Sequence, residues 1–401
     1  MGNNKNKNLI YLDYAATTPV DFQVQKEMEK YLGQNYGNPS SLHFMGRSAK
    51  QAVDGSRSKI AKILNCAPDE IIFTAGGTES DNLAILGIAR AYKKFGNHII
   101  VSKIEHHAVL EPCKILEKEG FEITYLNVDK EGIIDLSQLK SALRPETILV
   151  SIMYANNEIG TIQPIAEISK LISEFRNENS KFPIFHTDAC QAAGFLDLNV
   201  KKLGVDLLTL NGSKIYGPKQ IGILYRKSGI KIEPIIYGGG QEFGLRSGTE
   251  NVASIAGLAK ALELAEKNKT RESKRLAQFR DYLVSGILKS IAKTFLNGHP
   301  DKRLPNNINI SILGIEGESV ILMLDDYGIC ASTGSACTSK SLEPSHVILA
   351  LGRSHEFAHS SIRFALGNHT KKGDLNYLLK VLPVIVDKLR KMSPIKTENR
   401  N

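Results

Sequence analysis

The stretch Asn211-Gly-Ser-Lys-Ile-Tyr-Gly-Pro-Lys219 places Lys214 shortly after an apolar run, residues 205–210, that is typical of a buried strand. A lysine just past a strand end, among small and turn-forming residues, can reach into a cleft as a free amine. Such an amine can form a Schiff base with an aldehyde, and the aldehyde that proteins most often use in this way is pyridoxal phosphate. Most lysines are simply solvated at the surface, so the rest of the chain must decide between the two interpretations.

Short apolar runs recur along the chain and alternate with segments of helical spacing. The runs are residues 71–74, 98–102, 121–126, 147–153, 182–185, 205–210 and 221–225, and the helical segments include residues 79–94, 109–119 and 165–177. This alternation predicts βαβ units and an α/β fold with a mostly parallel, seven-stranded sheet that is buried on both faces. The connection between residues 210 and 221 is too short for a crossover helix, so we expect that pair of strands to be antiparallel.

The pattern changes after about residue 255. Long helices are expected at residues 253–267 and 271–294, followed by a strand at 308–312 and a final helix at 374–392. We therefore expect a large domain over residues 15–260 and a smaller α/β domain that combines residues 1–14 with 261–401. The smaller domain would carry a polar loop at about residues 330–345.

The amino-acid composition limits the classes of protein to which this chain can belong. The 401 residues are 42% hydrophobic and can bury a large core, and no apolar run is long enough for a transmembrane helix. The start of the chain lacks the apolar region of a signal peptide. The five cysteines form no Cys-x-x-Cys pair, which favours a reducing cytoplasm without disulfides or a metal site. The net charge of +9 comes from scattered lysines, so we expect no direct binding to nucleic acid or membranes.

Polar side chains follow several of the expected strands. These candidates are Gly77, Thr78, Glu105, His106, Asn157, Glu158, Asp188, Gln191 and Lys214. Ligands of open α/β sheets bind outside the carboxyl ends of the strands. Because chance would scatter such residues over both edges of the sheet, we expect them to form one site.

Four of these candidates have roles that follow from their chemistry. Gly77 and Thr78 predict a phosphate cradle, with Thr78 and Asp81 in the pattern of a capping box at a helix start. Asp188 could keep a pyridinium nitrogen protonated, or could cap a helix instead. His106 could stack on a ring and move protons, although a single loop histidine is more often structural.

Several longer stretches carry a family resemblance. They are Tyr11-Leu-Asp-Tyr-Ala-Ala-Thr-Thr-Pro19, Tyr36-Gly-Asn-Pro-Ser-Ser-Leu-His43, Phe73-Thr-Ala-Gly-Gly-Thr-Glu-Ser-Asp-Asn82, Asn156-Asn-Glu-Ile-Gly160 and Arg246-Ser-Gly-Thr249 after Gly238-Gly-Gly240. With Lys214 and Asp188, they make the chain similar to cysteine desulfurases of the NifS/IscS type. These belong to the class V aminotransferase family of fold type I pyridoxal-phosphate transferases.

The resemblance implies roles for the site residues. Lys214 would carry the cofactor, Asp188 would pair with the ring nitrogen, Gln191 would bond the ring hydroxyl and His106 would stack on the ring. The phosphate would be held by Gly77, Thr78 and Ser213, and by Thr249 of the neighbouring subunit of a homodimer. Asn157 and Arg363 would hold the substrate carboxylate, and Asn157 and Asn211 would also line the cofactor site. The family usually has Ser-Gly-His before the lysine, where this chain has Asn211-Gly-Ser213.

Cys337 suggests the reaction type. It lies in Ser332-Thr-Gly-Ser-Ala-Cys-Thr-Ser-Lys-Ser-Leu-Glu-Pro344, which has no apolar periodicity and is expected to be a surface loop. Cysteines are usually buried, so one in such a loop favours a reactive thiol. Cys330, in an apolar context, is the better structural candidate. The loop resembles the longer form found in the first of the two desulfurase groups, and Cys337 could also hold an iron–sulfur cluster transiently.

The resemblance therefore implies a cytoplasmic enzyme that removes sulfur from L-cysteine. The products would be L-alanine and a persulfide on Cys337, which passes to an acceptor such as an iron–sulfur scaffold or a tRNA-thiolation protein. A selenocysteine lyase or a β-lyase would share every cofactor residue, so these alternatives stay open. A catalytically silent relative would be expected to have lost Lys214, Asp188 or Cys337, and all three are present.

Overall fold

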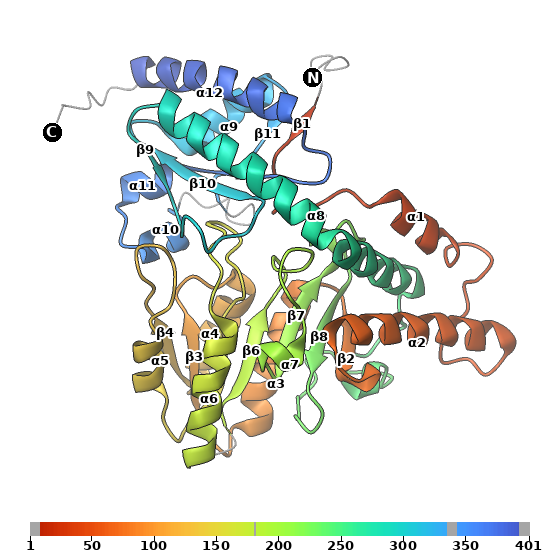
Figure 1. The fold of residues 1–401 in the computed structure, drawn as a ribbon. Helices are drawn as coiled ribbons and strands as arrows, with labels where there is room; N and C mark the ends of the chain where they lie inside the picture. The colour runs from red at the N-terminus through yellow and green to blue at the C-terminus, as the bar shows by residue number, and fades with distance from the viewer. Residues whose placement is uncertain (1–8, 180–181, 335–342, 393–401) are drawn as a thin grey trace.

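A seven-stranded sheet forms the centre of the lower half of the molecule in Figure 1. The computed structural model describes residues 9–179, 182–334 and 343–392, and within them the strand order is β2-β8-β7-β6-β5-β3-β4. The strands are β2 (Ile71–Thr74), β3 (His98–Ser102), β4 (Glu122–Leu126), β5 (Thr147–Ser151), β6 (Ile184–Asp188), β7 (Leu207–Asn211) and β8 (Gly222–Arg226). Only β8 is antiparallel to its neighbours β2 and β7. The predicted sheet and its antiparallel pair are both confirmed.

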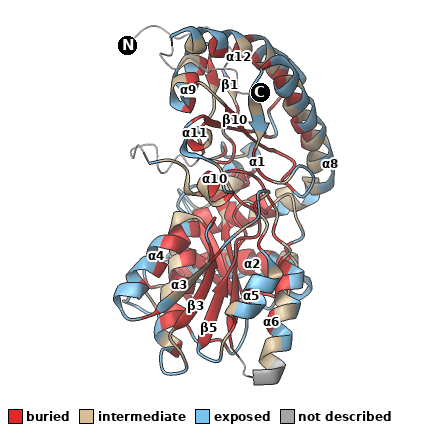
Figure 2. Cartoon of the chain, turned by 90° about the vertical axis from the view of Figure 1, so that its left-hand side faces the viewer, coloured by how far each residue is buried: buried red, intermediate tan, exposed pale blue. Residues whose placement is uncertain are grey.

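Helices cover both faces of this sheet, as Figure 2 shows by the buried strands between them. Successive strand residues point to opposite faces, so Ile71 and Phe73 pack on one side and Ile72 on the other. One face is covered by α3 (Gly77–Tyr92) and α4 (His107–Lys118). The other is covered by α2 (Phe44–Leu64), α5 (Leu136–Ala142), α6 (Ile165–Asn179), α7 (Val200–Leu203) and the start of α8 (Val252–Ser290). This double cover explains why the strands appear as continuous apolar runs in the sequence.

A second layer lies above the carboxyl edge of the large sheet. Its antiparallel sheet has the order β12-β10-β9, from β9 (Thr294–Leu296), β10 (Asn307–Ile312) and β12 (Ser361–Ala365). Beside it, β1 (Ile10–Tyr11) pairs in parallel with β11 (Ile329–Cys330). The end of α8, α9 (Gly317–Asp326) and α12 (Lys372–Met392) bury their apolar faces in the core of this layer. The start of the described chain thus pairs with the C-terminal layer.

Helix α8 corrects one expectation. It is a single helix over residues 252–290, where the sequence suggested two helices at 253–267 and 271–294. Its first turns are buried against the large sheet, whereas Leu276, Leu283 and Ile287 pack in the core of the C-terminal layer. The helix contacts the large sheet at its start and the C-terminal layer at its end, so its apolar stripe is interrupted in the middle. In the sequence, this interruption resembles a loop between two helices. The proposed boundary at residue 260 falls inside α8, and the division into two domains stays a prediction.

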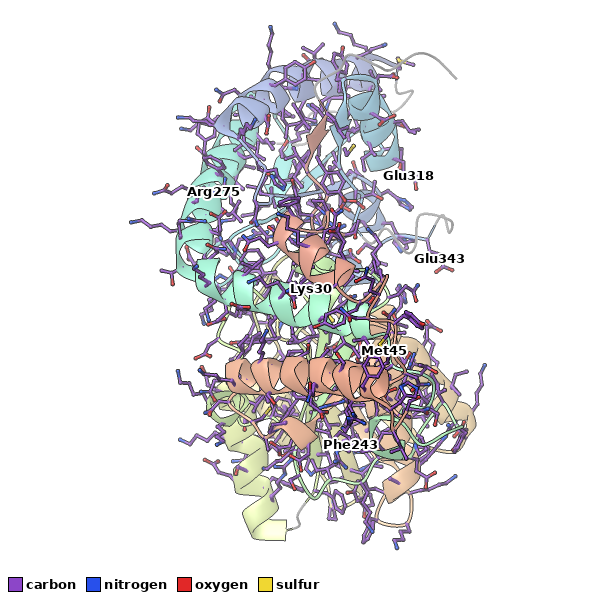
Figure 3. The ribbon with its side chains drawn as sticks, turned by 90° about the vertical axis from the view of Figure 1, so that its right-hand side faces the viewer. Lys30, Met45, Phe243, Arg275, Glu318 and Glu343 are labelled. Atoms are coloured by element: carbon purple, nitrogen blue, oxygen red, sulfur yellow. The ribbon has the colours of Figure 1, made fainter. Side chains whose placement is uncertain are left out.

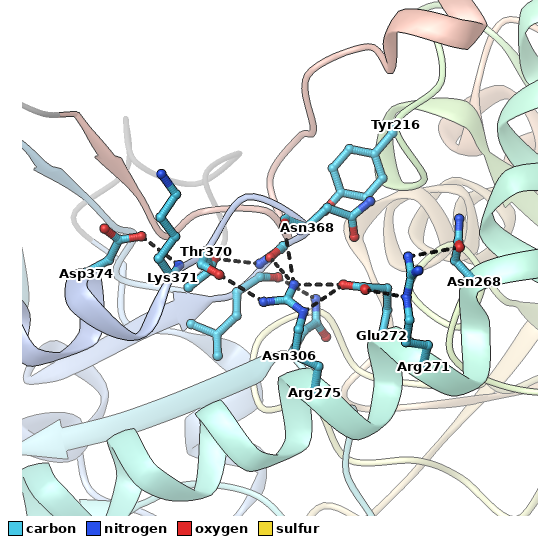
Figure 4. Close-up of polar contacts among 12 residues, drawn as sticks. Tyr216, Asn268, Arg271, Glu272, Arg275, Asn306, Asn368, Thr370, Lys371 and Asp374 are labelled. Atoms are coloured by element: carbon cyan, nitrogen blue, oxygen red, sulfur yellow. Dashed lines mark hydrogen bonds and ion pairs between the residues drawn. The ribbon is translucent and has the colours of Figure 1, made fainter.

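Polar contacts join the middle of α8 to the C-terminal layer (Figure 4). Arg275 donates from Nη1 to the carbonyl of Thr370 at 2.9 Å and from Nη2 to that of Gly367 at 3.0 Å. Glu272 accepts a 2.7 Å bond from the same guanidinium. The backbone N–H of Asn368 donates to the hydroxyl of Tyr216 at 2.7 Å. The segment at residues 367–370 is therefore tied both to α8 and to the turn that follows Lys214.

Short elements complete the described part of the chain. They are α1 (Phe22–Glu29), α10 (His346–Ala350), α11 (His355–His359) and the 3₁₀ turns η1 (Pro68–Glu70), η2 (Gly212–Lys214) and η3 (Glu242–Gly244). Figure 3 shows Phe243 of η3 and Met45 of α2 on the same side of the molecule, near one end of α2. Among the described residues, no helix is long and apolar enough to cross a membrane.

Candidate active site

One pocket of about 210 Å³ lies at the carboxyl edge of the large sheet. It gathers residues from the ends of several strands and from the second layer. The residues that line it are Ala15, Ala16, Gly77, Thr78, Asp81, His106, Met153, Asn157, Asp188, Cys190, Gln191, Asn211, Lys214 and Arg363. Nine of the residues that the sequence singled out are in this set: Gly77, Thr78, His106, Asn157, Asp188, Gln191, Asn211, Lys214 and Arg363. Seven of the nine candidates expected at this edge line the pocket, whereas Glu105 and Glu158 do not.

Lys214 closes η2, immediately after β7, and its amine is held by the N-terminal segment. Nζ donates to the carbonyl oxygens of Ala15 at 2.9 Å and Ala16 at 2.6 Å. The Asn211 side chain caps the same turn, because its Oδ1 accepts from both the backbone N–H of Ser213 at 3.1 Å and the Ser213 hydroxyl at 3.2 Å. Ser213 does not line the pocket. The turn thus presents the amine to the pocket, and the Ser213 hydroxyl points back to Asn211.

The glycine turn before α3 has a geometry that suits a bound anion. Gly76 has φ +144°, a conformation that L side chains rarely adopt. A Cβ on Gly77 would lie 2.8 Å from Sγ of Cys190, so a side chain there would disturb the pocket. Helix α3 begins at Gly77 and has no side-chain cap, so the capping box expected from Thr78 and Asp81 is wrong. The free N–H groups of the first turn, next to Thr78, remain available to a phosphate.

Two carboxyl groups line the pocket near its buried end. Asp188, at the end of β6, accepts a 2.9 Å bond at Oδ1 from the backbone N–H of Cys190. Asp81 is 1% exposed, and its Oδ1 has no hydrogen-bond partner in the described residues. Burial, with the Asp188 charge as a second cause, raises the pKa of Asp81 well above its usual range. Burial and the neighbouring Asp188 thus both favour the protonated form of the Asp81 carboxyl group.

Asp81 also faces a buried histidine. Its Oδ1 lies 3.6 Å from Nε2 of His186, which is fully buried in β6. Burial lowers the pKa of His186 to about 4, so the ring is neutral. The sequence analysis treated Asp81 only as part of a cap and missed its place in the pocket. The apolar spacing of α3 could have shown that residue 81 is buried, because this spacing turns it toward the core together with Ala84, Ile85 and Ile88.

His106 is the N-cap of α4 and presents its ring to the pocket. Its Nδ1 accepts a 3.1 Å bond from the backbone N–H of Ala108. An accepting Nδ1 assigns the proton of the neutral ring to Nε2. The cap therefore fixes both the orientation and the tautomer of the ring.

Arg363 enters the pocket from β12 in the second layer and is almost completely buried. Its Nη1 donates to the carbonyl of Asn157 at 2.9 Å, and its Nη2 donates to Oδ1 of Asp13 at 2.9 Å. Its Nε has no hydrogen-bond partner in the described part of the chain. The guanidinium is thus oriented by two anchors and keeps N–H groups for a carboxylate. Asp13, which the sequence analysis did not single out, is the anchoring acid.

The remaining polar residues are placed as follows. Gln191 donates from Nε2 to the carbonyl of Ala15 at 3.0 Å, so it contacts the same backbone segment as Lys214. Thr249 is exposed and does not line the pocket of its own chain. Cys337 lies outside the described residues, whereas Cys330 is in β11 and burial raises its pKa. The apolar context of Cys330 in the sequence corresponds to this strand.

The chemistry of the pocket residues fits the predicted cofactor, pyridoxal phosphate. An amine for an aldehyde, a carboxylate for a cationic ring nitrogen and a glycine turn at a helix start for a phosphate all face one cavity. The Cβ contact at Gly77 shows that the cradle has no room for a side chain.

Comparison with known proteins decides the family. The aminotransferase class-V family matches residues 10–378. The chain belongs to this family. It is 54% identical to the cysteine desulfurase IscS of Dictyoglomus turgidum, over 98% of each chain. It also resembles the solved structure of a NifS-like protein, with a TM-score of 0.89 and 36% identity over 95% of this chain and 100% of the other. A structure titled "SspA in complex with cysteine" has a TM-score of 0.78 and 36% identity, over 90% of this chain and 99% of that one.

These relatives confirm two predictions. The resemblance to NifS/IscS-type cysteine desulfurases holds over nearly the whole chain, and the fold is the class V, fold type I architecture. The individual roles of the site residues are not tested by these likenesses, and they stay predictions.

Proposed function

We propose that this protein is a cysteine desulfurase that uses pyridoxal phosphate to move sulfur from L-cysteine to Cys337. The observation that carries the proposal is the pocket in which Lys214, Asp188 and Arg363 converge from two layers of the fold. When bound, pyridoxal phosphate supplies an aldehyde and an electron-withdrawing ring that weakens the bonds around the amino-acid Cα. The names of the relatives support L-cysteine as the substrate.

The chain's own residues bind and orient the reactants. The carbonyls of Ala15 and Ala16 hold the Lys214 amine at the pocket wall, ready to take up the cofactor. Asp188 supplies the anion for the ring nitrogen, and the first turn of α3 supplies N–H groups for the phosphate. Arg363, fixed by Asp13 and Asn157, orients the substrate carboxylate and so fixes the direction of the cysteine side chain.

With the cofactor bound, the sulfur step balances between the Cys337 thiol, the substrate and the proton donors of the pocket. The thiolate of Cys337 attacks the substrate sulfur, a new S–S bond forms and the C–S bond of the substrate breaks. The released carbon takes a proton, for which Nε2 of His106 and the Lys214 amine are the available donors in the pocket. L-cysteine and one protein thiol thus become L-alanine and one protein persulfide, without an external oxidant.

The proposal also includes the oligomeric state, the sulfur acceptor and the location of the protein in the cell. A homodimer would bring Thr249 of one subunit to the phosphate of the other, which agrees with its exposed position outside its own pocket. The persulfide would pass to an acceptor protein, such as an iron–sulfur scaffold or a tRNA-thiolation protein. We place the protein in the cytoplasm, where a reducing environment keeps Cys337 available as a thiol.

The test compares Cys337→Ser with Cys330→Ser. We expect Cys337→Ser to keep the coloured cofactor and to bind L-cysteine, but to form almost no alanine and to carry no persulfide by mass spectrometry. Cys330→Ser should keep most of its sulfur transfer, because this thiol lies in a strand away from the pocket lining. Unchanged alanine release from Cys337→Ser would indicate a lyase, and a sulfur adduct on Cys330 alone would refute the assignment.

A further inference from the structure

Glu158 is a buried carboxylate that the chemistry above does not use. It is 2% exposed and follows β5 in the turn that also carries Asn157. The turn is rigid at this point, because the Glu158 N–H donates to Oδ1 of Asn156 at 2.8 Å. The Glu158 carbonyl accepts a 3.2 Å bond from Nδ2 of Asn309 in the second layer. Its backbone is thus held from both layers of the fold.

The Glu158 side chain meets both ends of the segment that contains Cys337. Its Oε2 accepts a 2.5 Å hydrogen bond from the Ser345 hydroxyl, on the C-terminal side of that segment. On the N-terminal side is Gly334, where a Cβ would lie only 2.9 Å from the same oxygen. Gly334 also has φ +138°, which L side chains rarely adopt. This buried oxygen is therefore hydrogen-bonded eight residues after Cys337, and it packs so closely on Gly334, three residues before Cys337, that no side chain fits there.

Each contact continues into a fixed element. The Ser345 hydroxyl accepts a 3.2 Å bond from the N–H of Ile348 and caps α10. Just before Gly334, Ser332 exchanges backbone bonds of 3.2 and 2.6 Å with Arg363, the proposed carboxylate-binding residue. The contact at Glu158 thus connects the described ends of the Cys337 segment to the wall of the pocket.

A second connection supports the first. Nε2 of His346, the residue after Ser345, is 3.0 Å from the carbonyl of Glu105, which precedes His106 in the chain. The C-terminal end of the segment is therefore tied to two pocket-lining turns, one through Glu158 and one through Glu105.

We propose that Glu158 is a positioning residue for sulfur transfer. Its carboxyl group bonds to Ser345 and packs against Gly334, so it holds the chain on both sides of Cys337 in the sequence. Holding both flanking positions at the wall of the pocket would favour delivery of the Cys337 thiol to the substrate. This inference rests on the proposed function, since it assumes that Cys337 receives the sulfur.

The experiment separates thiol positioning from cofactor and substrate binding. We expect Glu158→Ala to lower the single-turnover rate of alanine formation by about tenfold or more, because the thiol is less well directed. Two other quantities should stay within about twofold of the parent, because Glu158 does not line the pocket. They are the visible absorption of the bound cofactor and the L-cysteine concentration that gives half of the maximal spectral change. Glu158→Gln keeps an oxygen that accepts from Ser345, so it should recover most of the rate. Ser345→Ala removes only the hydroxyl donor and should slow alanine formation in the same way, which keeps the test valid if Glu158→Ala does not fold.

Glu343→Ala is the matched control. Figure 3 shows this acid at the described end of the same segment, and it is exposed to solvent, so its rate should equal that of the parent. A parent-like rate in both Glu158→Ala and Ser345→Ala would overturn the inference. So would a parallel loss of cofactor or cysteine binding, because that would indicate a general structural role. Cys337→Ser, measured alongside, tests the proposed function separately: alanine formation in that variant would refute the function itself.

Discussion

Glu105→Gln should make the protein more stable at alkaline pH and leave its stability nearly unchanged at acidic pH. Glu105 is fully buried, and its Oε1 accepts bonds from the Ser102 hydroxyl at 2.5 Å and the Met153 N–H at 2.9 Å. Its Oε2 has no hydrogen-bond partner within the described residues. Burial raises the pKa of Glu105 to about 8, against the opposing effect of the two hydrogen bonds. The folded protein therefore holds a proton on this side chain at physiological pH.

The size of the effect follows from the two protonation equilibria. The folded pKa of about 8 is above the ordinary value of 4.5, so the folded state binds the proton more tightly than the unfolded state. Its contribution to stability is complete below about pH 4.5 and is lost as the pH rises toward 8. Each pKa unit corresponds to about 1.4 kcal/mol, which gives a loss of roughly 4 to 5 kcal/mol across this interval. Glutamine keeps the accepting oxygen and does not titrate, so it avoids this loss.

The assay is urea unfolding of both proteins near pH 5, 7 and 9, with the cofactor bound. We expect similar free energies of unfolding near pH 5 and an advantage for Glu105→Gln of roughly 4 to 5 kcal/mol near pH 9. Glu343→Gln, at an exposed acid, serves as the control and should show no such trend. An equal destabilisation of Glu105→Gln at every pH would refute the reasoning, because it would mean that the buried carboxylate is charged in the folded protein.

Three further predictions concern the pocket. Lys214→Ala should lose the visible absorption of the bound cofactor and all alanine formation, and a parent-like rate of sulfide release would contradict the cofactor assignment. Arg363→Lys should raise the cysteine concentration for half-maximal spectral change by about 10- to 100-fold, because an ammonium cannot replace the planar donor pair; an unchanged value would place the carboxylate elsewhere. The protein should sediment as a dimer, and Thr249→Ala should release cofactor faster on dialysis without changing sedimentation; an active monomer would exclude the cross-subunit role.

The large sheet could be predicted because its strands are buried on both faces and therefore appear as uninterrupted apolar runs. The observed strands start and end within three residues of those runs; β5, for example, ends at Ser151, where the run continues to residue 153. The error at α8 has a definite cause. Arg275 donates to the carbonyls of residues 367 and 370, and Arg271 bonds to Asn268 within the helix, so the helix continues where no apolar stripe marks it.

The side chains of the pocket were predictable, but its backbone partners were not. Lys214, Asp188 and His106 follow strand ends, and parallel strands bring such positions to one edge. The carbonyls of Ala15 and Ala16 that hold the amine carry no signal of their own, since any residue has a carbonyl oxygen. Thr249 and Cys337 were chosen by resemblance, and their roles stay predictions.

With the roles proposed for Arg363 and Lys214, catalysis would depend on how the two layers fit together. The amine of Lys214 belongs to the large sheet, whereas the guanidinium belongs to β12 in the second layer. A substrate held by both must match the distance between layers, and small errors in such distances reduce rates strongly. The contact between Tyr216 and Asn368 therefore has a mechanistic consequence: it connects a residue two positions after Lys214 to a residue five positions after Arg363. Together with the bonds of Arg275 to residues 367 and 370, it links the two sides of the pocket through residues that do not line the pocket themselves.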